Sequence, residues 1–219
     1  MKLISYVIGV ILLCVLSSAA YGQSAASGAQ IKLPEPKYDG TVSVEKALKE
    51  RRSVRAYKDA PLSMSDVSQI LWAAQGITEP GRGLRTAPSA RAQYFLTVYF
   101  FAGNVTGLKQ GMYRYTPSGH MLEAVADGDM KGNLHKAAGQ SAIQKAPAAL
   151  VIAGAKDRAK NENWMYFEAG HAAQNVYLEG ESLGIGTVVM AGFDADATGK
   201  AISLPANEKV LYIMPIGRK

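Results

Sequence analysis

Three arginines and a serine lie within five positions of the chain, at Arg51, Arg52, Ser53 and Arg55. A guanidinium presents a rigid fork of N–H donors that matches phosphate geometry, and a serine hydroxyl adds one short hydrogen bond. If a helix continued through the segment, Arg51 and Arg55 would share a face and repel each other by about 0.2–0.5 kcal/mol. The cluster therefore predicts a bound anion. A solvated basic helix end is the alternative, because cations also suit the C-terminal end of the helix dipole.

Two other groups of residues invite a chemical interpretation, but their surroundings argue against it. The string GESLG at residues 180–184 matches the nucleophile elbow of serine hydrolases, yet it follows a predicted helix and precedes a predicted strand, the reverse of an elbow. A triad in the order Ser, acid, His also needs a histidine after Ser182, and none follows. Gly184 and Gly186 fit a helix stop and a turn instead.

The three histidines are His120, His135 and His171, which are too dispersed for a metal site. We expect the first to be a solvated turn residue, the second a surface helix residue and the third a structural residue on a long helix. Neither a Walker loop nor a glycine-rich Rossmann turn is present, so side chains must hold any phosphate. We therefore expect no metal and no catalytic side chain.

The first 22 residues have the pattern of a Sec-type bacterial signal peptide. Lys2 gives a positive start, residues 3–16 form an apolar run, and Ala20 and Gly22 offer small residues for cleavage. The run is shorter than the roughly 20 residues that a membrane-spanning helix needs, and an uncleaved membrane anchor is the alternative. We expect the protein to be periplasmic or secreted, without stable membrane insertion after cleavage.

The composition is that of an ordinary globular chain, with 219 residues of which 48% are apolar and 19% charged. Cys14, the only cysteine, lies in the signal, so the mature chain has no disulfide, thiolate ligand or cysteine nucleophile. The net charge of +6 falls to +5 when Lys2 is removed. Because an exported protein seldom meets nucleic acid, we expect an anionic small molecule as the partner of this surplus.

Helices and strands are expected in an irregular order, which favours one α+β domain over residues 41–219, after a flexible leader over residues 23–40. One helix begins at the cap Ser43 and ends near Arg52. A second begins with a capping box of Ser63 and Asp66 and stops at Gly76. Further helices are expected at 130–138 and 161–182, and strands at 94–102, 112–115, 121–124, 148–153, 187–190 and 210–216.

Four segments, in this order and spacing, resemble the FMN-dependent nitroreductase superfamily. They are ERRSVRAY (50–57), RTAPSA (85–90), GIGT (184–187) leading to AGF (191–193), and YIMPIG (212–217). The TAPSA loop, followed by GMYRY (111–115), looks most like the SagB-type dehydrogenase branch. The similarity covers nearly all of residues 43–217.

The resemblance implies a nitroreductase-like three-layer α+β sandwich that forms a domain-intertwined homodimer with two FMN molecules at the subunit interface. Carried over position by position, the residues that would bind the FMN phosphate are Arg51, Ser53 and Arg55, with Arg52 at the ribityl chain or the phosphate. The basic residue that reaches the phosphate from the C-terminus of the family's proteins would be Arg218 or Lys219.

The same carry-over gives the contacts of the flavin ring. Pro88, Ser89 and Ala90 would reach the flavin from the partner subunit. Ala191 and Gly192 would lie along the isoalloxazine ring, near its reactive nitrogen.

Two features of this chain depart from the family's pattern. Arg91 replaces the glycine or asparagine that many relatives have nearby, which would add a cation near the flavin or its substrate. The chain stops at Lys219, so we expect the family's usual C-terminal arm to be missing.

The implied activity is hydride transfer through the flavin, which NAD(P)H reduces and a nitroaromatic, a quinone or a similar acceptor reoxidises. This chemistry belongs to the cofactor and needs no protein acid or base. An export signal conflicts with a nicotinamide donor, because NAD(P)H is scarce outside the cytoplasm. The alternatives are a SagB-type flavin dehydrogenase with a non-nicotinamide partner and a non-catalytic periplasmic flavin-binding protein.

Overall fold

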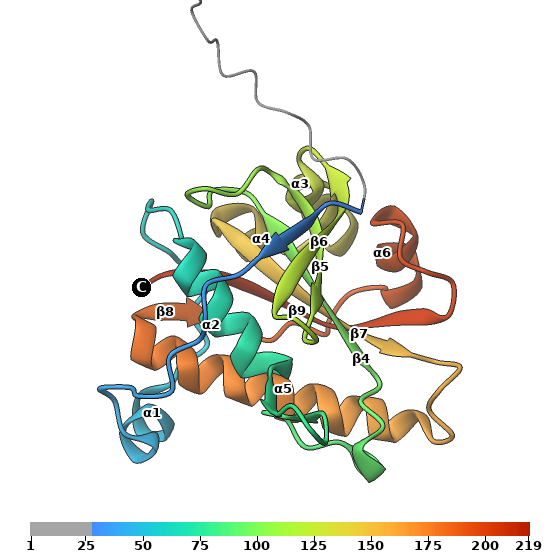
Figure 1. Cartoon of the computed structure of the whole chain (residues 1–219). Coiled ribbons are helices and arrows are strands. Elements are labelled where there is room, and N and C mark those ends of the chain that lie inside the picture. The colour runs from blue at the N-terminus through green and yellow to red at the C-terminus, as the bar shows by residue number, and fades with distance from the viewer. Residues whose placement is uncertain (1–27) are drawn as a thin grey trace, which may run out of the picture.

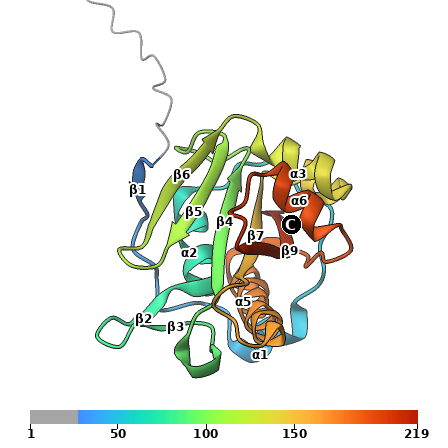
Figure 2. The ribbon, with the colours of Figure 1, turned by 90° about the vertical axis from the view of Figure 1, so that its right-hand side faces the viewer.

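The computed structural model describes residues 28–219, so the expected signal peptide and the first residues of the leader lie outside the described residues. Its centre is a seven-stranded sheet in the order β1-β6-β5-β4-β7-β9-β8, in which all neighbouring strands are antiparallel. Helices cover both faces of this sheet (Figures 1 and 2). The strands are β1 (Gln30–Lys32), β4 (Leu96–Ala102), β5 (Gly111–Thr116), β6 (Met121–Asp127), β7 (Ala148–Ala155), β8 (Ile185–Thr187) and β9 (Glu208–Arg218).

The remaining strands, β2 (Ile77–Glu79) and β3 (Leu84–Arg85), form a separate two-stranded ribbon. The helices are α1 (Val44–Glu50), α2 (Met64–Gln75), α3 (Met130–Ala138), α4 (Ser141–Lys145), α5 (Glu162–Leu183) and α6 (Ala195–Ala201), and a short 3-10 helix covers Ala90–Ala92. Within residues 28–219, no helix has both the length and the apolar character needed to cross a membrane.

Side chains that alternate along the central strands build two separate cores. On β4, Val98 and Phe100 pack into the core with α2 and α5, whereas Tyr99 and Phe101 face α3 and α4. This alternation follows from the two-residue period of a strand, and both faces are apolar because helices cover both. The expected three-layer α+β sandwich is confirmed.

The long helix α5 lies close to the sheet and to α2 (Figure 1). Small residues, Ala169, Ala172 and Ala173, are 0–3% exposed along its buried side. Their short side chains let the backbone approach its neighbours, as the sequence indicated. The capping box at Ser63 is also confirmed: Asp66 Oδ2 accepts from Ser63 N at 2.8 Å, and Ser63 Oγ accepts from Asp66 N at 3.2 Å.

Residues 28–40, which we expected to belong to a flexible leader, instead lie against the sheet and α2. Strand β1 pairs with β6 at the sheet edge, and Leu33 is 2% exposed. The side-chain amide of Gln69 accepts from the backbone N–H of Lys37 and donates to its carbonyl, at 2.9 and 2.8 Å. These backbone bonds fix the segment across α2.

Candidate functional site

The arginine stretch begins where α1 ends, and the helix stops at Glu50 rather than continuing to Arg52. Arg51 is the C-cap with φ −54° and ψ 133°, an extended conformation. The Arg52 guanidinium folds back and donates to the carbonyls of Lys49 and Arg51 at 2.9 and 2.8 Å, which satisfies free acceptors of the helix end. The helix therefore does not continue through Arg51 and Arg55, and the helical spacing considered for these two residues does not apply. In an extended chain, however, alternate residues point to the same side. Arg51, Ser53 and Arg55 are therefore still expected on one side of the stretch.

The stretch is fixed beside strand β8. Ser53 forms a parallel bridge with Thr187, and Val54 N donates to Thr187 O at 2.8 Å. A Cβ on Gly186 would lie 2.6 Å from Val54 Cγ1, so only glycine at 186 permits this approach. Gly184, at φ 66°, is the helix stop that we expected, but Gly186 lies in β8 rather than in a turn.

Tyr177 of α5 contacts both segments. Its hydroxyl accepts from Val189 N at 2.8 Å and lies 3.3 Å from Ser53 Oγ. The Arg51 guanidinium lies over its ring, 5.1 Å from the centroid, which is a cation–π distance. Residues 51–55 and 187–192 thus come together at the C-terminal half of α5.

The electrostatics of this region favour an anion. Within residues 28–219, none of Arg51, Arg52 and Arg55 takes part in an ion pair, and Arg52 and Arg55 are exposed. The hydroxyl of Thr187 is buried and has no hydrogen-bond partner in the described part of the chain. Such a donor set suits a phosphate, which accepts several charge-assisted hydrogen bonds.

The segment expected along a flavin ring lies open to solvent next to β8. Ala191 and Gly192 are exposed, and a Cβ on Gly192 would meet no atom within 4 Å. The side-chain amide of Gln140 donates to Gly192 O at 3.0 Å and holds that carbonyl in place. A planar ring could therefore approach the backbone here.

Pro88, Ser89 and Ala90 lie elsewhere, beside the N-terminal half of α5. Ser89 Oγ donates to Glu168 Oε2 at 2.6 Å and accepts from Tyr94 N at 2.8 Å. The Ser89 hydroxyl is therefore already hydrogen-bonded within the chain. Burial raises the pKa of Glu168, which is 1% exposed, although the bonds from Ser89 and the backbone oppose the rise.

Arg91, the departure from the family's pattern, has φ 57° and ψ 25°. This left-handed conformation favours glycine or asparagine over residues with a larger side chain. Arg91 is exposed, and its side chain extends from a strained part of the loop.

One chain does not bring this loop to the arginine stretch. Glu168 and Tyr177 are nine residues apart on α5, which corresponds to a rise of about 14 Å and about two and a half turns. The two residues therefore project from opposite sides of the helix. The predicted roles of both groups stay predictions, but a ligand that contacts both would need a second copy of the chain.

The two basic residues at the C-terminal end already have carboxylate partners. Arg218 donates to Asp66 Oδ2 at 2.5 Å and to Leu183 O at 2.8 Å, and Lys219 pairs with Glu181. The predicted contact of Arg218 with a phosphate would have to compete with the Asp66 carboxylate.

The histidines do not form a site. Contrary to the expectation of a solvated turn residue, His120 is 9% exposed, and its ring bonds Ser68 Oγ at 2.7 Å and Tyr115 Oη at 2.8 Å. Burial lowers its pKa. His171 Nδ1 bonds Pro88 O at 3.1 Å, which agrees with a structural role. Among residues 28–219 there is no cluster of three or more metal-ligating side chains.

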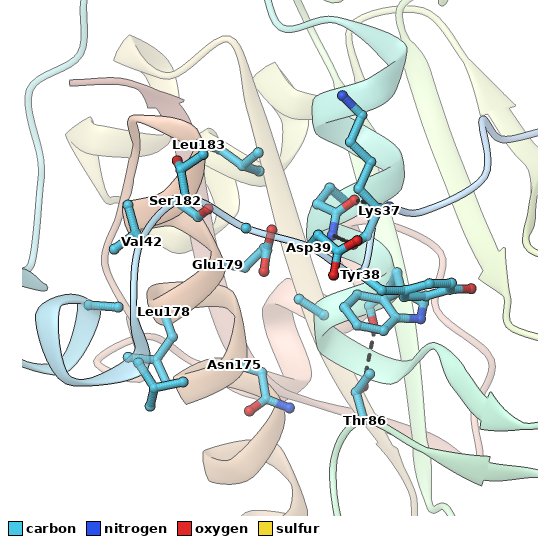
Figure 3. A pocket seen from close by; sticks show the side chains of 17 residues that line it. Lys37, Tyr38, Asp39, Val42, Thr86, Asn175, Leu178, Glu179, Ser182 and Leu183 are labelled. Atoms are coloured by element: carbon cyan, nitrogen blue, oxygen red, sulfur yellow. Dashed lines mark hydrogen bonds between the residues drawn. The ribbon is translucent and has the colours of Figure 1, made fainter.

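A cavity of about 650 Å³ lies between residues 37–42, α1, α2 and α5. Figure 3 shows Glu179 and Ser182 of α5 across it from Tyr38. Ser182 lies in the last turn of α5, before β8, and no histidine lines the cavity. The segment around Ser182 therefore has neither the strand-to-helix turn nor the histidine that a serine hydrolase needs.

Large apolar side chains are exposed around the cavity and along α5: Tyr38, Val44, Leu48 and Phe167 are 74%, 63%, 52% and 62% exposed.

The structure is thus an α+β sandwich whose surface carries three arginines without an ion-pair partner within residues 28–219. The model of the Nitroreductase family matches residues 48–218. A nitroreductase candidate of Methanocaldococcus jannaschii is 36% identical over 197 residues, which cover 87% of this chain and 96% of the relative. The chain therefore belongs to the nitroreductase family, and it is an oxidoreductase.

Solved structures agree with this assignment. The structure of a nitroreductase candidate from Ralstonia eutropha has a TM-score of 0.76 at 30% identity, covering 89% of this chain and 91% of that chain. A nitroreductase candidate of Desulfovibrio desulfuricans, solved in complex with FMN, has a TM-score of 0.61 at 20% identity, covering 80% and 85%. The latter likeness concerns the fold alone.

Proposed function

We propose that this oxidoreductase binds FMN and passes a hydride from NAD(P)H to a nitroaromatic, a quinone or a similar acceptor. The observation that carries the proposal is the group of three guanidiniums at 51, 52 and 55, which have no carboxylate partner within residues 28–219 and lie beside Ser53. A phosphate monoester carries a charge of about −1.5 to −2 near neutral pH, which these cations would balance. Bound FMN would supply the hydride chemistry itself.

The chain's own residues would bind and orient the cofactor. Arg51, Ser53 and Arg55 would hold the phosphate from one side of the extended stretch. The exposed backbone at Ala191 and Gly192 would lie along the ring, with the Gly192 carbonyl fixed by Gln140. No side-chain acid or base is required, because these residues act by binding and alignment.

We further propose that the active unit is a homodimer. The loop that contains Ser89 and the stretch that contains Arg51 lie on opposite sides of α5, so a second copy is needed to bring the two together. The exposed apolar side chains Val44 and Leu48 on α1 and Phe167 on α5 offer a surface that such a copy would cover. Light scattering of the purified protein would test this, and a monomer that retains FMN would contradict it.

Export to the periplasm or beyond is part of the same proposal and rests on the signal-like pattern of residues 1–22. In that compartment the donor could differ from NAD(P)H, and a SagB-type dehydrogenase with another partner is the second candidate. N-terminal sequencing of the protein recovered from a periplasmic extract would test the cleavage after Gly22.

The decisive experiment begins with the visible spectrum of the purified protein after FMN has been added and the excess removed. We expect a retained yellow flavin that NADH or NADPH bleaches without oxygen and that an added quinone restores. A flavin inert to both nicotinamides would favour the second candidate, and a protein that refuses FMN would contradict both.

A matched pair of variants tests the arginine stretch. Arg51→Ala with Arg55→Ala should leave a folded protein that loses FMN. Arg82→Ala with Arg114→Ala removes the same charge from exposed ion pairs elsewhere and should retain FMN. Equal flavin content in the two double variants would contradict the phosphate assignment.

A further inference from the structure

Tyr177 occupies a position in the site that neither the sequence motifs nor the family assignment explains. Its side chain leaves α5 between two segments that are far apart in the sequence, the arginine stretch and the segment that follows β8. It is half-buried, and its ring and its hydroxyl make different contacts. The ring supports the Arg51 guanidinium at 5.1 Å.

The hydroxyl connects the two segments through hydrogen bonds. Val189 N–H donates to Tyr177 Oη at 2.8 Å, so the phenol oxygen acts as an acceptor there. The phenol also lies 3.3 Å from Ser53 Oγ, and either hydroxyl can donate in that hydrogen bond. The same oxygen thus binds the backbone before Ala191 and the side chain in the middle of the arginine stretch.

We propose that Tyr177 is a positioning residue that couples the phosphate-binding stretch at 51–55 to the segment at 189–192 beside the flavin ring. The inference rests on the FMN binding proposed above. Tyr177 acts on the flavin through Ser53 and Val189: it orients the serine hydroxyl toward the phosphate and holds the backbone that the ring approaches. Its ring keeps the Arg51 guanidinium on the same side of the stretch.

Another tyrosine of the same helix provides a matched control. Tyr166 lies near the N-terminal end of α5, where its hydroxyl bonds Glu162 at 3.4 Å and its ring contacts Lys209. Tyr166→Phe removes a phenol from α5 without touching the predicted site. Tyr177→Phe removes only the hydroxyl and keeps the ring under Arg51, so a folded protein is expected, which a thermal melt verifies.

The test is a double-mutant cycle of Tyr177→Phe and Ser53→Ala, in which the dissociation constants of FMN and of riboflavin, which lacks the phosphate, are measured. One neutral hydrogen bond corresponds to about a fivefold change in affinity. We therefore expect Tyr177→Phe to weaken FMN binding about fivefold when Ser53 is present, and less than about twofold in the Ser53→Ala background, because coupled residues are not additive. Riboflavin should lose less affinity than FMN, and Tyr166→Phe should change neither.

Hydrogen exchange in the flavin-free protein tests the second connection. The Val189 amide should exchange faster in Tyr177→Phe than in the wild type, because its acceptor is lost. This readout does not depend on a bound cofactor or on turnover.

Three results would overturn the inference: an unchanged FMN affinity in Tyr177→Phe, an equal loss in the two serine backgrounds, or an unchanged Val189 exchange rate. Each would mean that the phenol supports the fold without coupling the two segments. A wild-type protein that binds no FMN would instead contradict the proposed function. The two failures are therefore distinguishable.

Discussion

Gly186→Ala tests whether the close approach of β8 to the arginine stretch builds the site. The new Cβ would lie 2.6 Å from Val54 Cγ1, 2.7 Å from its Cβ and 3.0 Å from its Cγ2. Carbon atoms in favourable contact are about 3.5–4.0 Å apart, so the segments must separate by about 1 Å. Val54 is β-branched and stiff at χ1, and it cannot turn away to make room.

The magnitude follows from two terms. Overpacking of this kind costs about 1–3 kcal/mol. The separation also weakens the bond from Val54 N to Thr187 O, now 2.8 Å, which contributes about 1 kcal/mol. A combined loss of about 2–4 kcal/mol lowers the melting temperature by roughly 4–16 °C for a domain of this size.

The assay combines thermal unfolding with FMN titration. FMN affinity should fall about tenfold or more, because the arginine stretch moves away from the segment that it faces. Gly170→Ala is the control, since a Cβ there meets no atom within 4 Å and alanine favours a helix. Val54→Gly should rescue Gly186→Ala, whereas Val54→Ala should do so only in part because its Cβ remains. A Gly186→Ala protein that melts and binds FMN like the wild type would refute the reasoning.

Three further changes test other parts of the structure. Ser182→Ala should leave activity intact, and a folded but inactive variant would revive the hydrolase interpretation. Burial holds the pKa of His120 below its usual value of about 6.5. Its contribution to stability is therefore complete above that pH and is lost as the pH falls through the lowered folded-state value. His120→Asn, which tolerates the φ of 48°, should flatten the dependence of urea unfolding on pH below about 6.5, and an unchanged slope would contradict this. Asp66→Asn removes the carboxylate that caps α2 and holds Arg218, and calorimetry should show a loss of about 1–3 kcal/mol; unchanged stability would mean that neither contact matters.

Long elements were predictable because burial leaves a recognisable pattern of apolar residues in the sequence. Residues 148–153 are a continuous apolar run because β7 lies in the middle of the sheet with helices on both faces. Short elements have no such signal. The helix α4 has five residues, too few to establish a helical period, and α6, although as long as α1, has none of the large apolar residues that gave α1 its spacing. The strand β1 has three, and its pairing with β6 depends on contacts distant in the sequence.

The donor types of the candidate site can be read from the sequence, whereas their geometry cannot. Three arginines and a serine indicate an anion because donor type is visible in the sequence, and that indication stays a prediction. The helix α1 ends at Glu50, close to the end expected near Arg52, and the Arg52 side chain rather than a glycine bonds the Lys49 carbonyl there. His120 was misjudged because Ser68 and Tyr115 bury it, one of them on a distant helix. The role of Tyr177 left no signal, since nothing local distinguishes a tyrosine that reaches a site from one that fills a core.

The long helix α5 would place two motifs that are far apart in the sequence so that both could contact one ligand in the proposed homodimer. Glu168 holds the loop at Ser89 on one side of the helix, and Tyr177 holds the stretch at Arg51 on the other, about 14 Å along its axis. In a single chain, the Ser89 loop and the arginine stretch therefore face away from each other. In the proposed homodimer, the loop of one protomer would lie against the arginine stretch of its partner, and symmetry would then give two equal sites. The helix would thus fix the spacing of both groups, and flavin binding and dimerisation are expected to fail together when the exposed Phe167 surface of α5 is disrupted.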